Sequence, residues 1–280
     1  KQGLEDFSIS RSNERAKGVG VPVPDDPNQK IYVWFDALNI YMTGIGFGWD
    51  EDHWKKWGPA DLHIIGKDIN RFHTVYWPAM LLSAGLPLPK QILIHGFVNA
   101  KGGEKFSKSL GNAPEPKEVL EKYPLEAVRY YMLSQVPIQD DHDFDFDRFE
   151  EVYNADLANG LGNLVARVAK LCEQNNVDVG TELACEHFEV PVEISLEDYK
   201  FNEALSFIWE RMSEIDKKIS DKKPWKLTGK EVEDFLAVVA LEIQDIAFNL
   251  QPFLPQTSEK ILKQFTGEIN SASPLFPRIP

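Results

Sequence analysis

Two strand-length apolar runs joined by a helical segment constrain the fold of this chain more than any other feature. The runs are residues 61–65 and 91–98, and residues 69–84 between them have a helical pattern. Parallel strands need a crossover connection of this kind, so the pattern predicts a parallel βαβ unit. Ligands of such sheets bind beyond the carboxyl ends of the strands, which here carry Gly66-Lys67-Asp68 and His95-Gly96-Phe97.

The crossover helix has recognisable boundaries. Asp68 is placed to cap its start, and Gly85 with Pro87 is placed to end it. Pro78 lies inside the segment and predicts a kink or a break there. Ahead of this unit, residues 30–35 read Lys-Ile-Tyr-Val-Trp-Phe, a composition that predicts a further strand.

After residue 112 the pattern is helical almost throughout. Residues 156–175 place a stripe of apolar side chains on one helix face: Leu157, Leu161, Leu164, Val168, Leu171 and Cys172. Further helices are expected at residues 116–122, 125–136, 202–220, 230–250 and 257–265, and the acidic residues 140–147 are expected to be a loop. The fold class is therefore an α/β region followed by an all-α region.

Net charge and cysteine usage narrow the functional classes. The 280 residues carry a formal net charge of −14, which argues against a general nucleic-acid binder but permits a specific partner held by local basic and aromatic groups. A phosphate backbone is not expected against the acidic side chains of residues 140–151. Cys172 and Cys185 are expected to be free thiols in a reducing cytosol.

No apolar run of the sequence is long enough to span a membrane, so no membrane partner is expected. Residues 1–6 lack the apolar core of a signal peptide and enter ordered-looking sequence at once. We therefore expect a cytoplasmic protein and a chain that is a fragment.

The clearest candidate site is residues 101–112, which read Lys-Gly-Gly-Glu-Lys-Phe-Ser-Lys-Ser-Leu-Gly-Asn. Lys105 and Lys108 flank Ser107, and lysine ammonium groups suit phosphate oxygens. Glycines let a backbone close around a ligand, so the stretch predicts a polyphosphate-binding loop, with a solvated basic turn as the alternative. The glycine spacing does not fit Gly-x-x-x-x-Gly-Lys-Ser/Thr, which sets aside an ATPase of the P-loop type.

Candidate ligand-binding residues also gather near the predicted strand ends. An apolar pocket that suits a thioether could be lined by Trp34, Asp36, Ala37, Tyr41, Ile69, His73 and Trp77. Gly66 permits close approach of a ligand to a helix start, and Asp68 could bind ribose hydroxyls or an amino group. The alternatives are a plain hydrophobic core with a satisfied His73, and a simple helix cap at Asp68.

A third group lies in the helical region. Asn159, Asn163 and Arg167 recur every four residues along one helix, and Trp225 follows Lys223-Pro224 in a loop. Amides and a guanidinium can hydrogen-bond unpaired base edges, and tryptophan can stack on a base. A solvated polar face with a half-buried tryptophan is the alternative.

Taken in chain order, these pieces resemble the methionyl-tRNA synthetases across essentially the whole chain. Residues 3–11 are similar to the segment that re-enters the catalytic domain of that family after a zinc-bearing insertion. The remaining matching pieces are Tyr32-Val33-Trp34-Phe35-Asp36-Ala37, Gly66-Lys67-Asp68-Ile69 with His73 and Trp77, His95-Gly96, Lys105-Phe106-Ser107-Lys108-Ser109, Asn154-Ala155-Asp156-Leu157 through Asn163 and Arg167, and Pro224-Trp225. Phe106 replaces the usual methionine of the signature loop, and because both are apolar we expect little effect on the lysines.

The resemblance implies ATP-dependent activation of methionine to methionyl-adenylate and transfer of the acyl group to tRNA(Met). It implies Lys105 and Lys108 as catalytic residues on the triphosphate. The ATP site would be Gly66, Asp68, His95, Gly96, Val98, Lys105, Ser107 and Lys108, and the methionine site Trp34, Ala37, Tyr41, Ile69, His73 and Trp77. The CAU anticodon would be read by Asn159, Asn163, Arg167, Pro224 and Trp225. ATP is expected with Mg²⁺, and no metal site is expected in this chain.

The resemblance also implies a domain order. Residues 1–100 would be the second half of a Rossmann-like catalytic domain, residues 101–148 the signature loop and a stem-contact region, and residues 149–280 a helical anticodon-binding domain. The His-Ile-Gly-His segment and the zinc-ligand cysteines of the family are absent from this sequence. We therefore expect the missing N-terminal half as a partner, and this chain alone to be inactive.

Two other interpretations stay open at this point. A different class I synthetase, such as the cysteinyl one, resembles the chain mainly around the signature loop, and the residues from Trp34 to Tyr41 with Pro224-Trp225 argue against it. A non-catalytic tRNA-binding module, or one chain of a split synthetase, would retain the helical region without a complete ATP site.

Overall fold

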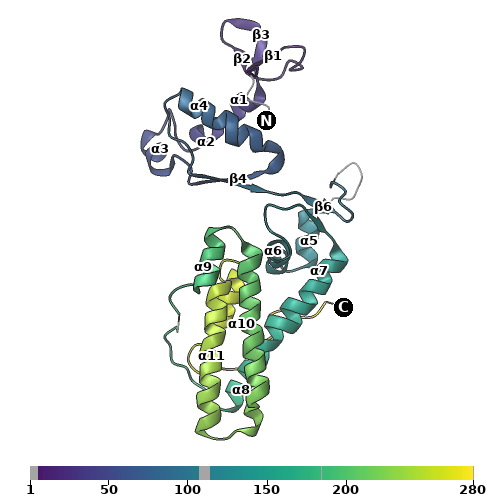
Figure 1. Cartoon of the computed structure of the whole chain (residues 1–280), viewed down its shortest axis with the longest axis vertical. Helices are drawn as coiled ribbons and strands as arrows, with labels where there is room; N and C mark the ends of the chain where they lie inside the picture. The colour runs from purple at the N-terminus through teal and green to yellow at the C-terminus, as the bar shows by residue number, and fades with distance from the viewer. Residues whose placement is uncertain (1–5, 107–113, 184, 280) are drawn as a thin grey trace. The chain divides into compact units, whose positions relative to one another are not determined.

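The computed structural model describes residues 6–106, 114–183 and 185–279 (Figure 1). The chain divides into two compact units, Lys1–Gly96 and Phe97–Pro280. The first unit combines short strands and helices, and the second is mainly helical, in agreement with the predicted order of an α/β region before an all-α region. The expected domain boundaries after residues 100 and 148 stay predictions.

A short parallel sheet supports the first unit. Strands β4 (Leu62–Gly66) and β5 (Gln91–His95) pair in parallel, with Leu62 opposite Gln91 and Gly66 opposite His95. The predicted βαβ unit is therefore confirmed, and the carboxyl ends of both strands lie at the same edge of the sheet.

The crossover between these strands is one helical segment of three kinds of turn. It consists of the 3-10 turn η1 (Lys67–Ile69), the π-helical turn η2 (Phe72–Tyr76) and the helix α4 (Trp77–Ser83). Pro78 lies at the start of α4, where its missing N–H removes a helical hydrogen bond, and the predicted break is the π turn directly before it. The predicted cap by Asp68 is wrong, because Gly66 is the N-cap residue and no side chain caps this end.

The strand predicted at residues 30–35 is wrong in its second half. Strand β3 (Asp26–Ile31) pairs antiparallel with β1 (Ser10–Ser12) and β2 (Pro22–Val23) and ends before Tyr32. The chain then enters α1 (Val33–Ala37), where the carbonyl of Tyr32 accepts hydrogen bonds from the amides of Phe35 and Asp36. Packing outweighs β propensity there, because the helix lets Trp34 stack on Phe72 with 4.3 Å between ring centroids.

Two further helices complete the first unit. Helix α2 (Ile40–Thr43) follows α1, and α3 (Glu51–Trp57) starts at Asp50, whose side chain accepts a hydrogen bond from the amide of His53. The buried side chains of this unit form a small core around Leu38, Met42, Trp77 and Leu81. This core packs the crossover helix against the segment after β3.

The second unit starts with another parallel pair, β6 (Val98–Ala100) and β7 (His142–Phe144). The loop predicted at residues 140–147 is therefore wrong, since that range contains β7 and the first residues of α7 (Phe146–Val152). Helices α5 (Pro116–Lys122) and α6 (Leu125–Ser134) lie between the paired strands in sequence, close to the predicted bounds.

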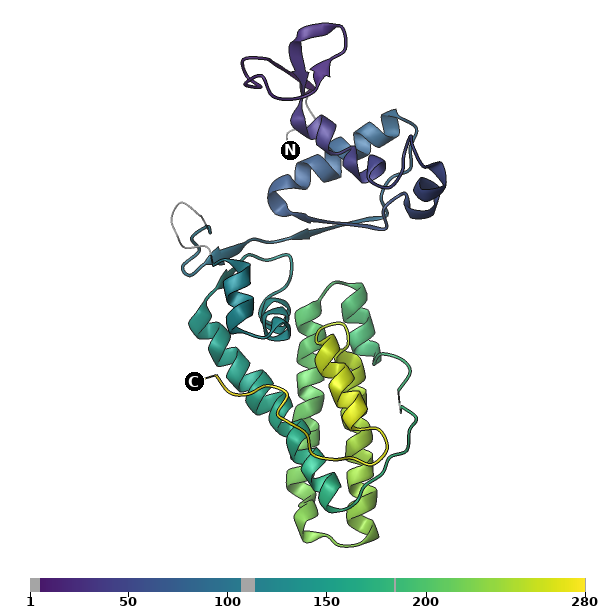
Figure 2. The same cartoon turned by 180° about the vertical axis from the view of Figure 1, so that it is seen from behind.

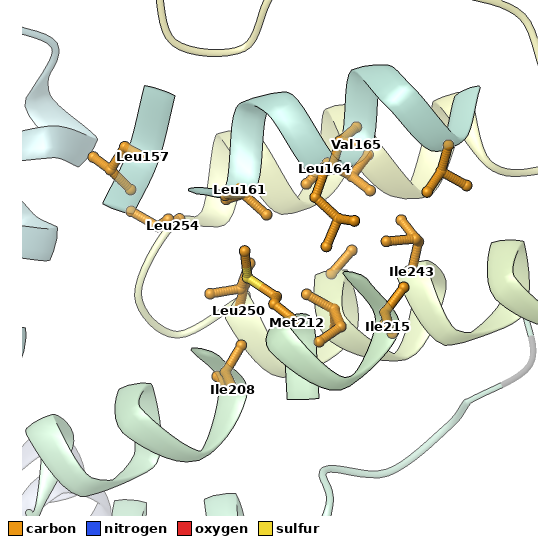
Figure 3. Packing of buried hydrophobic residues seen from close by; sticks show 14 of the residues in the cluster. Leu157, Leu161, Leu164, Val165, Ile208, Met212, Ile215, Ile243, Leu250 and Leu254 are labelled. Carbon is orange, nitrogen blue, oxygen red and sulfur yellow. The ribbon is translucent and has the colours of Figure 1, made fainter. Parts of the chain in front are cut away.

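One long helical segment organises the rest of this unit. Helix α7 continues through the π-helical segment η3 (Tyr153–Gly162) into α8 (Asn163–Gln174), so the segment starts earlier than predicted. The predicted apolar stripe is confirmed, with Leu171 partly buried and its other members buried. Figure 3 shows stripe residues such as Leu164 facing Met212 and Ile215.

The partners of this segment are long helices. They are α10 (Phe201–Lys222) and α11 (Lys230–Leu250), accompanied by α9 (Val190–Glu197), the 3-10 turn η4 (Pro224–Lys226) and α12 (Pro255–Gln264). The C-terminal tail returns along the long segment, as Figure 2 shows. Asn154 binds both the amide and the carbonyl of Ile279, each at 3.0 Å, and the Tyr153 hydroxyl donates to the carbonyl of Pro277 at 2.7 Å.

Burial keeps both thiols of the chain protonated. Cys172 and Cys185 are free, and burial raises the pKa of each to about 12. Within the described ranges, no helix is both long and apolar enough to cross a membrane.

A buried carboxylate ties α6 to α12. Glu126 is 7% exposed and accepts hydrogen bonds from the amide of Gln256 at 2.6 Å and from the amide and hydroxyl of Thr257 at 3.0 and 2.6 Å. It thereby supplies the acceptor that Leu254, the N-cap residue of α12, lacks.

Replacing Glu126 by alanine is expected to lower the free energy of unfolding by about 2–3 kcal/mol, because it leaves helix amides and a hydroxyl buried without an acceptor. Urea denaturation of the whole chain, followed by circular dichroism at helical wavelengths, measures this change. Glu121→Ala is the control, since Glu121 forms only an exposed 3.8 Å ion pair with Lys117 and its loss should cost no more than about 0.5 kcal/mol. Equal unfolding midpoints for the two variants would contradict the role of Glu126.

Candidate functional site

The carboxyl ends of β4 and β5 bring three predicted nucleotide-binding residues together. A Cβ atom added to Gly66 would lie 2.9 Å from Asp68 Oδ1 and 3.7 Å from His95 Cε1, so a side chain at this position would displace the Asp68 carboxylate. His95 Nδ1 donates a hydrogen bond to the carbonyl oxygen of Gly96 at 2.8 Å, which leaves Nε2 as an acceptor in the neutral ring. The sheet edge therefore presents a glycine flanked by a carboxylate and an imidazole.

The predicted methionine residues form a cluster of rings beside the crossover segment. The Tyr41 hydroxyl donates to His73 Nε2 at 2.8 Å, because His73 Nδ1 donates to the carbonyl of Ile69 at 2.9 Å. Trp34 meets the His73 ring edge-on at 6.1 Å, and Tyr41 lies 6.0 Å from Trp77 between ring centroids. His73 is 1% exposed with both ring nitrogens bonded, as the alternative of a satisfied core histidine requires.

Two details of the cluster bear on a ligand. Ala37 lies in α1, in the same helix as Trp34, which was predicted to lie in a strand. The indole Nε1 of Trp77 is buried and has no hydrogen-bond acceptor among the residues described. A donor of this kind, left over inside an aromatic cluster, is unusual in a closed core.

The electrostatics of the cluster favour an uncharged ligand. His63, on β4, packs its ring 4.3 Å from that of Tyr41. Burial, and secondarily the neighbouring His73, lowers the pKa of His63, and burial raises the pKa of Tyr41. Both groups are therefore neutral near pH 7, and with the indole rings of Trp34 and Trp77 they offer polarisable ring surface without a formal charge.

Sequence reasoning missed a cavity in the first unit. A cavity of about 690 Å³ lies between the α1–α2 segment and the crossover helix, with Phe35, Met42, Tyr76 and Met80 in its walls. Of the residues predicted for methionine, only Trp77 also lines it. Apart from Trp77, no residue of its wall was a candidate ligand-binding residue in the sequence, because a largely apolar wall has the same pattern as a core.

The predicted polyphosphate-binding loop, residues 101–112 and called the lysine loop below, starts as a hairpin in the second unit. Ala100 and Glu104 form an antiparallel bridge, and between them Gly102 and Gly103 have positive φ angles of 83° and 76°. Lys105 Nζ then lies 5.4 Å from the centre of the Phe97 ring. Ser107 and Lys108 lie outside the described residues, and Val98 belongs to β6.

The predicted ATP-binding residues are thus divided between the units. Gly66, Asp68, His95 and Gly96 belong to the first unit, whereas Val98 and Lys105 belong to the second. The first group meets at one sheet edge, and the second lies on one strand and the hairpin that follows it.

Acidic residues that the sequence interpretation set aside hold this hairpin. Asp143 Oδ2 accepts hydrogen bonds from the amides of Gly102 and Gly103 at 2.9 and 3.0 Å, and Asp141 Oδ1 accepts from the amide of Phe97 at 2.8 Å. Lys101 Nζ lies 2.7 Å from Asp145 Oδ2 and lowers the pKa of that carboxyl group. The signal was present in the sequence, since Asp141, Asp143 and Asp145 alternate as side chains on one side of a strand do.

The predicted anticodon residues lie on an exposed polar face. Asn159 and Asn163 are exposed, and Arg167 forms an ion pair with Asp216 of α10. Arg167 Nε is buried and lacks a partner among the described residues. Trp225 is 59% exposed in η4, more than the half-buried alternative required, while the preceding Pro224 is buried.

Two neighbours of this face serve the fold. Asn154 holds the C-terminal tail, and Asp156 Oδ2 accepts a hydrogen bond from the Tyr130 hydroxyl at 2.9 Å. They match the family segment in sequence, but their side chains already have partners within the chain.

The chain matches known proteins throughout its length. The family described as "tRNA synthetases class I (M)" matches residues 1–169. The methionine–tRNA ligase of Synechocystis sp. is 43% identical over 98% of this chain and 55% of its own length, and that of Thermotoga maritima is 38% identical over 95% and 44%. A Mycobacterium tuberculosis methionyl-tRNA synthetase in complex with methionyl-adenylate is similar in structure, with a TM-score of 0.80, 33% identity, and coverage of 99% of this chain and 61% of that one.

The fold and these matches define a chain of the class I aminoacyl-tRNA synthetases. Within that class the chain belongs to the methionyl-tRNA synthetase family, and the cysteinyl alternative is excluded. The chain spans about half the length of the curated relatives, 44% and 55% of the two named above.

The imidazole of His63 is expected to titrate below pH 6.5, its ordinary value, because burial disfavours the charged ring. A lowered folded-state pKa means that this histidine contributes full stability above the unfolded-state pKa and loses it as the pH falls below that value. The NMR chemical shifts of the ring across a pH titration measure the midpoint. In the variant His73→Gln, the His63 midpoint should stay low, since burial is the larger cause of the shift. A His63 midpoint at or above pH 6.5 in the unmodified chain would contradict the neutrality of His63.

Proposed function

We propose that this chain provides part of the active site and the anticodon reader of a methionine–tRNA ligase. The reaction is ATP-dependent formation of methionyl-adenylate, followed by acyl transfer to tRNA(Met). The observation that carries the proposal is the arrangement of the first unit. There, Gly66 ends β4 and lies beside the side chains of Asp68 and of His95, which ends the parallel strand β5. An aromatic cluster lies beside the crossover that joins the two strands.

The nucleotide would bind at the strand ends. Gly66 has no side chain to obstruct the adenosine, and the Asp68 carboxylate and His95 Nε2 can accept hydrogen bonds from ribose hydroxyls or an amino group. Gly96 and Val98 would contact the base through their backbone. Such a site lies where open parallel sheets bind their ligands.

The methionine side chain would pack against the ring cluster of Trp34, Tyr41, His73 and Trp77, with Ala37 and Ile69 at its margin. A thioether is apolar and polarisable, and sulfur makes favourable contacts with ring edges. His63, whose pKa is lowered by burial, adds no charge that would favour an acidic or basic side chain instead. This electrostatic character supports methionine over a charged amino acid.

The chemistry needs positioning more than acid–base catalysis. The methionine carboxylate attacks the α-phosphate of ATP, a P–O bond forms, and pyrophosphate leaves with the electrons of the bond that breaks. Lys105, together with Lys108 and Ser107, would hold the triphosphate and offset the charge that develops on its oxygens. Mg²⁺ would arrive with ATP as part of the substrate.

The helical unit would read the anticodon. Asn159 and Asn163 offer exposed amide groups, Arg167 offers a partly exposed guanidinium, and Trp225 offers an exposed ring for stacking. These groups suit the unpaired bases of a CAU anticodon, and the unit could bind tRNA without the rest of the enzyme.

The length comparison favours a second candidate role for the chain by itself. Because it spans about half of its relatives, it could bind tRNA without catalysing adenylate formation, and need an upstream half as its partner. Methionine-dependent ATP–pyrophosphate exchange separates the two roles. The chain alone should show none, and the chain together with the upstream part should be active.

Lys105→Ala is expected to lower kcat/KM for ATP in pyrophosphate exchange by about 100- to 1,000-fold, since it removes a cation that stabilises the transition state. The assay uses the chain together with the upstream half. Lys117→Ala, at an exposed lysine of α5, is the control and should exchange at the unmodified rate. A Lys105→Ala rate within about twofold of that control would remove Lys105 from the site.

Trp225→Ala is expected to raise the Kd for a CAU-anticodon stem-loop by about 5- to 150-fold, because base–aromatic stacking contributes about 1–3 kcal/mol. Fluorescence anisotropy of a labelled stem-loop measures it on the 280-residue chain. Trp57→Ala is the matched control, since Trp57 is 56% exposed but lies in the first unit. Unchanged affinity in Trp225→Ala would remove this residue from the anticodon site.

A further inference from the structure

The hairpin that leads to Lys105 depends on a backbone conformation that needs support. Gly102 and Gly103 both have positive φ angles, and no atom lies within 4 Å of a Cβ placed on either residue. Glycine is therefore required there by the backbone conformation, not by lack of space. Two successive glycines also have the greatest conformational freedom, so another interaction must fix the turn.

Asp143 provides that interaction. One carboxylate oxygen, Oδ2, accepts hydrogen bonds from both glycine amides, at 2.9 and 3.0 Å. Two consecutive amides converging on one anion form a small anion-binding concavity of the backbone, which the chain fills with its own side chain. Charge-assisted hydrogen bonds of this kind are stronger than those between neutral groups.

The strand register explains why Asp143 reaches the turn. Strands β6 and β7 pair in parallel, with Asn99 opposite Asp143, so residue 143 lies just before the hairpin turn on the neighbouring strand. Its neighbours two residues away hold the adjoining parts of the hairpin, Asp141 through the amide of Phe97 and Asp145 through Lys101. Asp143 in β7, with Asp141 and Asp145 directly before and after that strand, thus fixes three parts of the same segment.

We propose that Asp143 is a positioning residue for Lys105. By fixing the Gly102–Gly103 turn, it sets the place on the hairpin from which Lys105, stacked over Phe97, meets the nucleotide triphosphate. This inference rests on the proposed function. The Asp143 carboxylate repels the phosphates less than a free carboxylate would, because it already accepts hydrogen bonds from two backbone amides.

Amide hydrogen exchange on the 280-residue chain tests the first step. Asp143→Ala is expected to speed exchange at Gly102 and Gly103 by about 10-fold or more, since it removes their acceptor. Asp178→Ala is the matched control. Asp178 Oδ1 accepts from the amide of Gly180 at 2.7 Å, and Gly180 has a positive φ of 77°, so its loss should affect only that turn. Unchanged exchange at both glycines in Asp143→Ala would overturn the inference.

A double-mutant cycle in pyrophosphate exchange tests the second step, with the chain and the upstream half together. Asp143→Ala should lower kcat/KM for ATP by about 10- to 100-fold with KM for methionine unchanged, and Asp143→Asn, which keeps an acceptor oxygen, should recover most of the loss. Asp143→Ala combined with Lys105→Ala should be no slower than Lys105→Ala alone, because the two residues act as one unit.

The outcomes distinguish the inference from the proposed function. If Lys105→Ala abolishes exchange but Asp143→Ala does not alter it, only the inference fails. If the two losses multiply, or if KM for methionine rises in parallel, Asp143 has a general structural role and the inference is also overturned. If Lys105→Ala exchanges normally, the assignment of the lysine loop in the proposed function fails, and the inference fails with it.

Discussion

The parallel register between β4 and β5 is the constraint on which the first unit depends. A parallel pair needs a crossover, and the crossover has to leave the sheet where β4 ends, at Gly66. For that reason Asp68, in the first turn of the crossover, comes beside His95 at the end of the partner strand. The rings farther along the crossover are then carried past the same unit, where Tyr41 binds His73. One backbone pairing therefore brings Gly66, Asp68 and His95 into the same unit as the methionine candidates.

The features that could be predicted from the sequence are those with a periodic or boundary signal. Helices α5 and α11 have the predicted bounds, and the buried stripe of the long segment in the second unit follows its apolar spacing. The small sheet of β1, β2 and β3 could not be predicted, because Asp26–Ile31 is polar and lacks alternation. Residues 33–37 have strand composition, yet the stacking of Trp34 on Phe72 draws them into a helix. Tertiary contacts of this kind have no local signal.

The π-helical turns limit what spacing arguments could establish about the candidate site. His73 lies in η2 and Asn159 in η3. A π-helix has more residues per turn than the α-helix that was assumed when residues four apart were placed on one face. Side chains four apart are then not stacked along one line, so the shared faces predicted for these residues hold only in part. Such turns are frequent at functional sites, since they re-aim side chains within a helix. Here the crossover segment and the α7–α8 segment, which both carry candidate binding residues, each contain one.

Several carboxylates of this acidic chain accept hydrogen bonds from its own backbone amides. Glu126 and Asp143 each bind two neighbouring amides, and Asp145 binds Lys101, so the net charge of −14 overstates the field that an anionic ligand would meet. Arg167 is a different case, since its partner Asp216 is a side chain on the exposed surface. An exposed ion pair contributes at most about 1 kcal/mol, and a nucleotide base can replace such a partner at little cost. Under the proposed function, the Arg167 guanidinium of this acidic chain would bind a specific RNA, while the net negative charge disfavours nucleic acid elsewhere on its surface.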